Sequence, residues 1–352
     1  MTYRTLPAAI SRWLTEPVPR GRIAAFRTLV YLFVAADLVI FTPWVRHKTD
    51  IPGELYQPLL VGRLLPLPTP NPLLVEVIFW ALLLLSLAAA TGRAPRALGW
   101  PVFLLYFEWM IIAMSYGKVD HDRFAFLVAL AVLPTAGRAR HGDGERTEAG
   151  GWALRVTQIA VVCTYFLAAW AKLRFGGIEW LTSSVLARAI IRRGTELADL
   201  IAQVPYLLIA AQFGIIAFEL LSPLVFVVSA RWRQAVVAFF YSFHLVTFAT
   251  ITISFAPHLV AMTSFLELER LRPIDRLVRW RARRSGGDAG PNRIGEPRPA
   301  GPNRIGEPQP VAPSVEAADP PGTVGSPANS GGIGGPAVPP EAPPVQPSPA
   351  VP

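Results

Sequence analysis

Lys172 is the side chain of this protein that is best placed to do chemistry, because it ends an apolar segment, residues 153–172. A lysine at such a position has two physical possibilities. Its ammonium group can reach the lipid headgroups and act as a charged anchor. Alternatively, an apolar pocket can favour the neutral amine, which then serves as a general base. The segment alone leaves both interpretations open.

A second candidate, His121, lies in the polar stretch Lys118-Val-Asp120-His121-Asp122-Arg123, at the start of the apolar segment 121–137. His121 and Asp122 could therefore project into the mouth of a helix bundle. Aspartates at a helix start also cap free backbone N–H groups, which explains Asp120 or Asp122 without any further function. Histidine and aspartate can bind metals, but no spacing here repeats a ligand pattern, and we predict no metal site.

Tyr241 and His244 form a third group, on one face of the apolar segment 234–254 at positions i and i+3. A histidine inside a membrane segment can be a neutral ring that hydrogen-bonds a neighbouring helix. It can also help to bind or deprotonate a ligand. We therefore consider Tyr241 and His244 to be candidates for binding a cofactor.

Ionisable residues also occur inside other apolar segments, where each costs about 2.5–3.5 kcal/mol at a helix centre. They are Arg27, Asp37, Glu108 and Glu219. One interpretation is a buried polar network that serves a pocket or a relay. The other is structural pairing, for example of Arg27 with Glu108 or Glu219.

The composition indicates what must position these groups. Apolar residues make up 52% of the chain and charged residues only 16%, which argues against a soluble protein of 352 residues. Apolar runs approach the roughly 20 residues that cross a bilayer. We predict an all-α, polytopic membrane bundle of about eight transmembrane helices, of which the fourth and eighth are short enough to be re-entrant or deeply packed. The predicted segments are 23–42, 73–91, 97–115, 121–137, 153–172, 206–228, 234–254 and 255–269.

Arginines predict the orientation of the bundle. They cluster before the first segment and after the last, so both termini are expected in the cytoplasm, on the inner side of the cell membrane. Lys172 and His121 then fall on the outer side.

The net charge of +9 reflects this asymmetry and attraction to anionic lipid, so we predict no nucleic-acid partner. Cys163 is the single cysteine, which excludes an intramolecular disulfide or a dithiol redox centre.

Four regions follow from these patterns: a cytoplasmic segment 1–22, the transmembrane domain 23–269, a basic juxtamembrane segment 270–284 and a tail 285–352. The tail holds 18 of the 35 prolines and no aromatic residue, so we expect it to be disordered.

Residues 181–201 place apolar and charged side chains on opposite faces. They predict either an amphipathic helix on the outer membrane surface or an ordinary packed loop helix.

The stretch Tyr165-Phe-Leu-Ala-Ala-Trp-Ala-Lys172-Leu, followed by Trp180, resembles the membrane domain of vitamin K-dependent gamma-glutamyl carboxylases. It is also similar to bacterial proteins with a horizontally transferred transmembrane (HTTM) domain. That family has a Tyr-Phe-x-Ala-Gly-x-x-Lys-Leu-type motif and a downstream tryptophan. The resemblance covers roughly residues 20–270 and includes Arg27, an Asp120-His121 pair and a Phe243-His244 pair.

The resemblance implies a quinone-type cofactor, similar to vitamin K. The lysine that matches Lys172 is proposed in the carboxylases to deprotonate the reduced quinol, so Lys172 and His121 become candidate catalytic residues. Trp180 joins Tyr241 and His244 as a candidate for cofactor binding. Some bacterial members occur beside or fused to thiol–disulfide oxidoreductases, which implies such a partner.

Three departures argue against peptide carboxylation itself. Asp120 replaces an asparagine, Ala171-Lys172 replaces paired lysines, and the tail replaces a large lumenal substrate-binding domain. We therefore expect a carboxylase-like membrane protein that binds a quinone or another lipophilic cofactor near the outer face. The alternative is a non-enzymatic scaffold or a partner subunit of a redox system.

Overall fold

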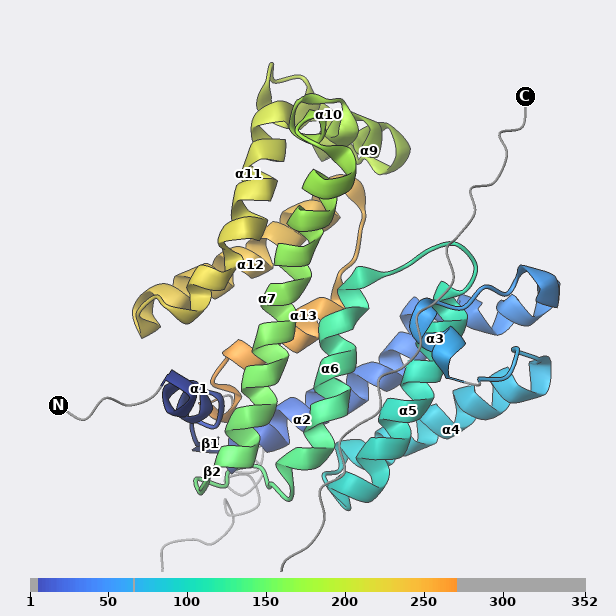
Figure 1. The fold of residues 1–352 in the computed structure, drawn as a ribbon, viewed down its shortest axis with the longest axis vertical. Helices are drawn as coiled ribbons and strands as arrows, with labels where there is room; N and C mark the ends of the chain where they lie inside the picture. Colours follow the sequence, from blue (N-terminus) through green and yellow to red (C-terminus); the bar gives the residue numbers. More distant parts are fainter. Residues whose placement is uncertain (1–5, 66, 271–352) are drawn as a thin grey trace, which may run out of the picture. The chain divides into compact units, whose positions relative to one another are not determined.

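A computed structural model describes residues 6–65 and 67–270, and these residues form an all-α bundle, as predicted (Figure 1). Six helices are long and apolar enough to cross a membrane. They are α2 (Arg20–Ala36) with its π-helical extension η1 (Asp37–Phe41), α4 (Pro72–Ala90), α5 (Pro95–Met114), α7 (Glu148–Gly176), α11 (Leu207–Leu221) with the 3-10 turn η6 (Ser222–Phe226), and α12 (Ala230–Ile251).

Shorter elements connect or cover these helices. The remaining helices are α1 (Leu6–Leu14), α3 (Leu60–Leu64), α6 (Phe124–Val132), α8 (Glu179–Thr182), α9 (Val185–Arg193), α10 (Glu196–Ala202) and α13 (Ala256–Met262). Two-residue strands β1 (Val18–Pro19) and β2 (Arg146–Thr147) pair antiparallel, with Val18 opposite Thr147. Turns of 3-10 helix are η2 (Pro43–Asp50), η3 (Gly53–Leu55), η4 (His121–Arg123), η5 (Leu133–Ala136), η7 (Thr263–Phe265) and η8 (Leu268–Arg270).

The fourth and eighth predicted segments form shorter helices than the other six. The fourth becomes η4, α6 and η5, and the eighth becomes α13 with its following turns. Pro134 explains the end of α6, because it lies where α6 passes into η5. The predicted tail 285–352 and most of the basic segment 270–284 lie outside the described residues.

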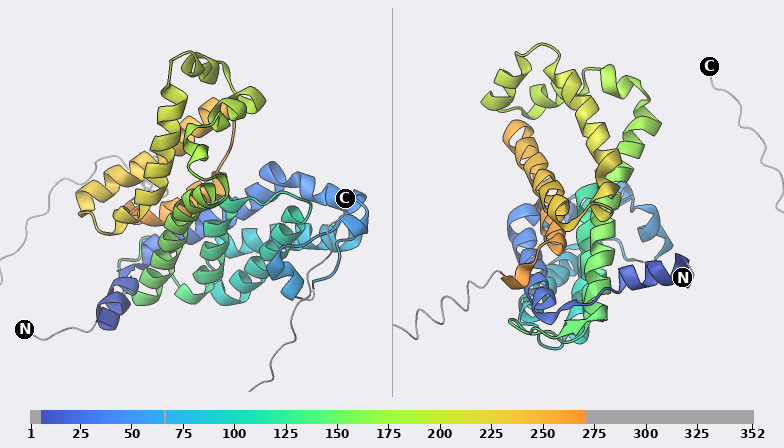
Figure 2. Two further views of the ribbon diagram at one scale, coloured as in Figure 1. Left: turned by 45° about the horizontal axis from the view of Figure 1, so that its top comes forward. Right: turned by 90° about the vertical axis from the view of Figure 1, so that its left-hand side faces the viewer.

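Contacts between distant loops define two ends of the bundle. At the end that carries β1 and β2, called the basic end, Arg22 donates to Glu269 at 2.8 and 2.6 Å. At the end that carries α8, α9 and α10, called the cap end, Thr252 donates to the Arg193 carbonyl oxygen at 3.2 Å. The two ends are separated along α7 in both Figure 1 and Figure 2. Helices α7, α11 and α12 reach the cap end, where they contact α8 or α10.

Helix α7 links the two halves of the bundle. Its first half packs with α2, α5 and α6 around one apolar core, and its middle packs with α12 and α13 around a second. Near its C-terminal end it contacts α8 and α11. In α11 and α12 only 28% and 17% of the apolar stretch is buried. These faces present apolar side chains such as Phe213, Leu245 and Phe248 to the surroundings, as lipid-facing helices do.

Candidate functional site

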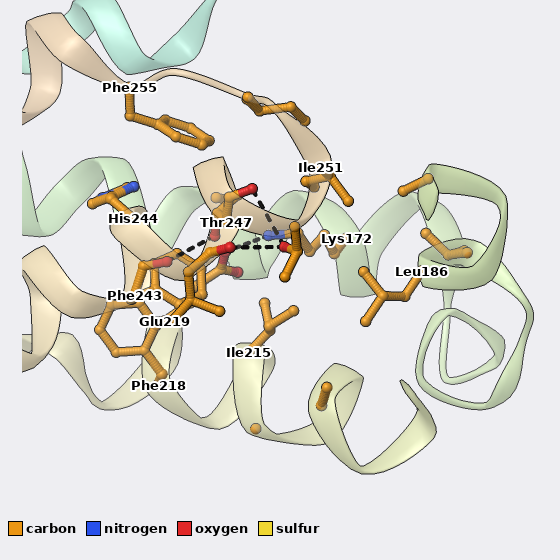
Figure 3. Close-up of a pocket in the computed structure, with 18 of the residues that line it drawn as sticks. Lys172, Leu186, Ile215, Phe218, Glu219, Phe243, His244, Thr247, Ile251 and Phe255 are labelled. Carbon is orange, nitrogen blue, oxygen red and sulfur yellow. Dashed lines mark hydrogen bonds and ion pairs between the residues drawn. The ribbon is translucent and has the colours of Figure 1, made fainter. Parts of the chain in front are cut away.

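A cavity of about 550 Å³ lies at the cap end, between α7, α11, α12 and α13. The cap helices α9 and α10 close one side of it with apolar residues such as Leu186, Ile190 and Ile201. The amphipathic segment 181–201 is therefore two helices, and part of its apolar face lines this cavity. Most of the other walls are also apolar, including Phe218, Phe243 and Ile215, which are drawn in Figure 3.

Five of the residues predicted from the sequence line this cavity: Lys172, His121, His244, Trp180 and Glu219. They come from α7, η4, α12, α8 and α11, which are far apart in the chain. Helix packing thus brings together the lysine, the two histidines and the tryptophan that the sequence pattern singled out.

Lys172 points into the bundle and pairs with Glu219 of α11. Its Nζ atom donates to Oε1 of Glu219, and Figure 3 shows the two side chains reaching toward each other. The Glu219 side chain is 7% exposed and that of Lys172 is 26% exposed. The ammonium also lies 5.6 Å from the ring centroid of Trp180, at the distance of a cation–π contact. Lys172 is thus part of a charge pair at the cavity wall.

His244 is held by an aromatic cluster on the opposite wall. Its Nε2 atom shares a hydrogen bond of 2.7 Å with the hydroxyl of Tyr165, and the two rings stack with centroids 5.6 Å apart. His258 of α13 meets the ring of Tyr165 edge-on, with centroids 4.9 Å apart. Its own centroid is 5.2 Å from that of His244. Rigid rings therefore fix both imidazoles at the cavity.

Several buried polar atoms of these residues have no hydrogen-bond partner within the described part of the chain. They are Oε2 of Glu219, Nδ1 of His244 and both ring nitrogens of His258. All three residues are at most 5% exposed, and all three line the cavity. A buried donor or acceptor without a partner costs about 1–3 kcal/mol. Their concentration at one apolar cavity therefore indicates a site for a molecule with a polar head.

His121 lies at the rim of the cavity, where part of its ring is exposed and the centroid is 6.2 Å from that of Phe255. Desolvation lowers the pKa of His121, and the positive charge of Lys172 lowers it further. Both causes favour the neutral form of the ring. A neutral imidazole offers one donor and one acceptor to a molecule that enters the cavity.

Gln212 of α11 holds the cap in place. It is 1% exposed, and its amide nitrogen donates to the carbonyl oxygens of Trp180, Leu181 and Ser183 at 2.8–3.1 Å. Its Oε1 atom accepts from the backbone N–H of Leu186 at 2.9 Å. One side chain thus fixes α8 and the start of α9, and with them the ring of Trp180.

The lining of the cavity does not include Tyr241, Arg27, Asp37 or Glu108, the other residues predicted from the sequence. The hydroxyl of Tyr241 donates to the Leu259 carbonyl oxygen at 3.1 Å, and Tyr241 is not among the lining residues. Arg27 is buried and donates to the Gly137 carbonyl oxygen at 2.6 Å. Glu108 is half-buried on α5.

The four predicted buried charges therefore do not form one network. Asp37 pairs with Arg123 at 2.7 Å, Glu219 pairs with Lys172, and Arg27 bonds to backbone. The pairs of Arg27 with Glu108 or Glu219 that the sequence suggested are not among the ion pairs of residues 6–65 and 67–270. Which carboxylate faces a given cation depends on how each helix is rotated about its axis, and apolar runs do not reveal this rotation.

Sequence reasoning did not single out His258, Tyr165 or Gln212 as site residues. His258 lies in the short segment that begins after Phe255, where one histidine among apolar residues gave little signal. Gln212 was available as the one amide in the apolar segment 206–228. Tyr165 belongs to the motif that ends at Lys172, seven residues later, which places both side chains near one helical face.

Comparisons with protein-family models, with curated proteins and with solved structures found no match. The similarity to the carboxylase-like membrane domain thus remains a resemblance of motif residues.

Proposed function

We propose that this chain is a multi-pass membrane protein that binds a lipophilic cofactor, a quinone or a similar molecule, in the cavity at the cap end. The observation that carries the proposal is the set of unpartnered atoms on Glu219, His244 and His258. They face an otherwise apolar cavity that also contains the charge pair of Lys172. The motif around Lys172, with its resemblance to the carboxylase-like membrane domain, supports the same assignment.

The chemistry of a quinone suits both the apolar and the polar side chains that line the cavity. Its ring and isoprenoid chain would occupy the apolar part, and about 550 Å³ falls in the range of roughly 300–1,000 Å³ that is usual for small-molecule sites. A quinone carbonyl oxygen accepts hydrogen bonds from Lys172 or from a histidine N–H. A quinol hydroxyl donates to a carboxylate or to a neutral imidazole nitrogen.

The pair of Lys172 and Glu219 determines how a proton could be taken from a quinol. As an ion pair, the lysine is protonated and cannot act as a base. Either the carboxylate of Glu219 accepts the quinol proton directly, or the Lys172 proton first moves to Glu219 and frees the amine. Both routes leave the proton on the same pair of residues, so Glu219 is as necessary as Lys172 for general-base chemistry.

The same proposal places the protein in the cell membrane. The apolar exposed faces of α11 and α12 support contact with lipid tails. Arginines in the loops of the basic end support a cytoplasmic location for that end and for both termini, by the positive-inside rule. The cavity then opens near the outer face.

The test is quinone binding to purified protein. Lipid extraction followed by mass spectrometry measures the co-purified quinone, and titration with menaquinone, followed by tryptophan fluorescence, measures affinity. We expect stoichiometric binding by the wild type and a loss of about tenfold or more in K172A, because a hydrogen bond to a charged group contributes about 1.5–3 kcal/mol. The matched control is K118A, which removes a 72% exposed lysine that pairs with Asp120.

A second variant separates binding from folding, since K172A leaves the Glu219 carboxylate buried without its partner. The double substitution K172M/E219Q removes both charges and should fold, while it still loses the quinone. Absence of stoichiometric quinone in the wild type, or equal affinity of the wild type and K172M/E219Q, would overturn the proposal. The scaffold alternative is then favoured if K172A also preserves complex assembly while substitutions of Arg27 or Glu219 disrupt folding.

A further inference from the structure

A second hollow, of about 480 Å³, lies at the basic end, away from the cofactor cavity. Two loops and one helix form it: the loop between α4 and α5, the loop after η5, and the side of α2 that carries Ala24 and Thr28. The hydroxyl of Thr28 donates to the Ala90 carbonyl oxygen at 3.0 Å and lies 3.1 Å from Nε2 of His141, which ties these parts together.

The charge of the hollow is entirely positive. Arg93, Arg138 and Arg140 line it together with His141, and no aspartate or glutamate is among the lining residues. Within residues 6–65 and 67–270 these three arginines form no ion pair, whereas Arg22 and Arg123 do. Three guanidinium groups around one hollow repel each other, so an anion that enters it relieves this repulsion.

The backbone around the hollow adds to this field. Helix α5, of 20 residues, starts at Pro95 directly after the lining residue Ala94, so the positive end of its dipole lies at the hollow. Ala94 itself has a left-handed backbone with φ of 44°, which is uncommon for a residue with a Cβ atom. The buried Arg27 holds the carbonyl oxygen of Gly137, and this bond positions the loop that carries Arg138 and Arg140.

We propose that this hollow binds the phosphate group of an anionic membrane lipid. A guanidinium group matches two oxygens of a phosphate with parallel hydrogen bonds, and the hollow offers several such groups. It lies at the ends of α2, α4 and α5, the depth at which lipid headgroups surround a membrane-spanning bundle. The inference uses the membrane placement proposed above but does not depend on the occupant of the cofactor cavity.

The experiment compares lipid retention by two variants with equal charge. R138Q/R140Q removes two arginines from the hollow, and R231Q/R233Q removes two from the first turn of α12, which lie outside it. Protein in nanodiscs of phosphatidylglycerol and phosphatidylcholine is analysed by native mass spectrometry. We expect the wild type and R231Q/R233Q to retain phosphatidylglycerol, and R138Q/R140Q to lose about ten- to thirtyfold in affinity, at roughly one kcal/mol per basic residue near the surface.

Two results would overturn the proposal. Equal losses in both double variants would show only a general attraction of basic loops to anionic lipid. No loss in either variant would show that the hollow binds no phosphate. A competition with inorganic phosphate distinguishes the source of the group: displacement of the lipid at millimolar concentration assigns the hollow to soluble phosphates, and no displacement assigns it to the lipid headgroup.

Discussion

At the scale of single residues, the buried carboxylate of Asp37 is paired with a buried arginine. Asp37, at 0% exposed, accepts from Nη1 of Arg123 at 2.7 Å and from the hydroxyl of Tyr106 at 3.0 Å. Trp109 donates to Thr42 next to them at 3.1 Å. These bonds join η1, α5 and η4, the turn that also carries His121. The Asp37 pair is therefore structural, whereas the pair of Lys172 and Glu219 lies at a cavity.

Substitution D37N should destabilise the protein strongly. It leaves the Arg123 guanidinium buried without its counter-charge, and breaking a buried pair in this way costs about 3–5 kcal/mol. Thermal unfolding in detergent, followed by circular dichroism, measures the change. The control D120N breaks the exposed pair with Lys118, for which we expect about 0–1 kcal/mol. Equal unfolding midpoints for the two variants would contradict this assignment.

At the scale of elements, the cap formed by α8, α9 and α10 depends on α11. Gln212 makes four hydrogen bonds with the segment from Trp180 to Leu186. The helices of that segment are short. Thr195 adds a bond of 2.7 Å to the Ala249 carbonyl oxygen of α12. Short helices have few internal hydrogen bonds, so these side-chain bonds decide where the cap lies.

Substitution Q212L should loosen the cap and weaken cofactor binding. Three carbonyl oxygens and one N–H group lose their partner, and Trp180 is no longer held beside Lys172. We expect faster limited proteolysis within residues 177–206 and about tenfold weaker quinone binding, at roughly 1–3 kcal/mol for unpartnered groups.

The matched control for this prediction is Q203L. Gln203 is exposed at the end of α10, and its side chain makes no hydrogen bond with the described residues. The Q203L protein should resemble the wild type in both assays. If Q212L and Q203L are cleaved at the same rate, Gln212 does not hold the cap.

At the scale of the whole bundle, the two ends differ in charge and in content. The basic end holds the arginine-lined hollow, and the cap end holds the apolar cavity. Arg22, in the first turn of α2, bonds to Glu269 in η8, so the first long helix and the last described turn meet at the basic end. The bundle therefore separates the hollow that we propose for a phosphate group from the cavity that we propose for a lipophilic cofactor.

Cysteine labelling in spheroplasts tests this orientation. In a C163S background, a membrane-impermeant maleimide should label K118C directly and R231C only after permeabilisation, because Lys118 lies near the cap end and Arg231 starts α12 at the basic end. Each variant is its own control before and after permeabilisation. Labelling of R231C in intact spheroplasts would reverse or refute the proposed topology.

Much of the fold could be predicted from local signals. Apolar runs marked the six long helices to within a few residues, and the two segments predicted to be short form the shorter helices. The candidate site was predicted in part: Lys172, His121, His244 and Trp180 line the cavity, but Tyr241 does not. Tyr241 and His244 are three residues apart on α12, so their side chains leave the helix in different directions. His244 lines the cavity, whereas the hydroxyl of Tyr241 bonds to the Leu259 carbonyl oxygen.

By itself, the sequence determined where helices form and which of them carry ionisable groups, because hydropathy and charge act over neighbouring residues. Only the tertiary structure decided the partners of those groups. Glu219 lies 47 residues from Lys172, and Asp37 lies 86 residues from Arg123. Such pairs depend on the rotation and packing of whole helices, which many weak contacts set together. For the same reason, three unpartnered polar residues at one apolar cavity could be recognised only in the folded chain.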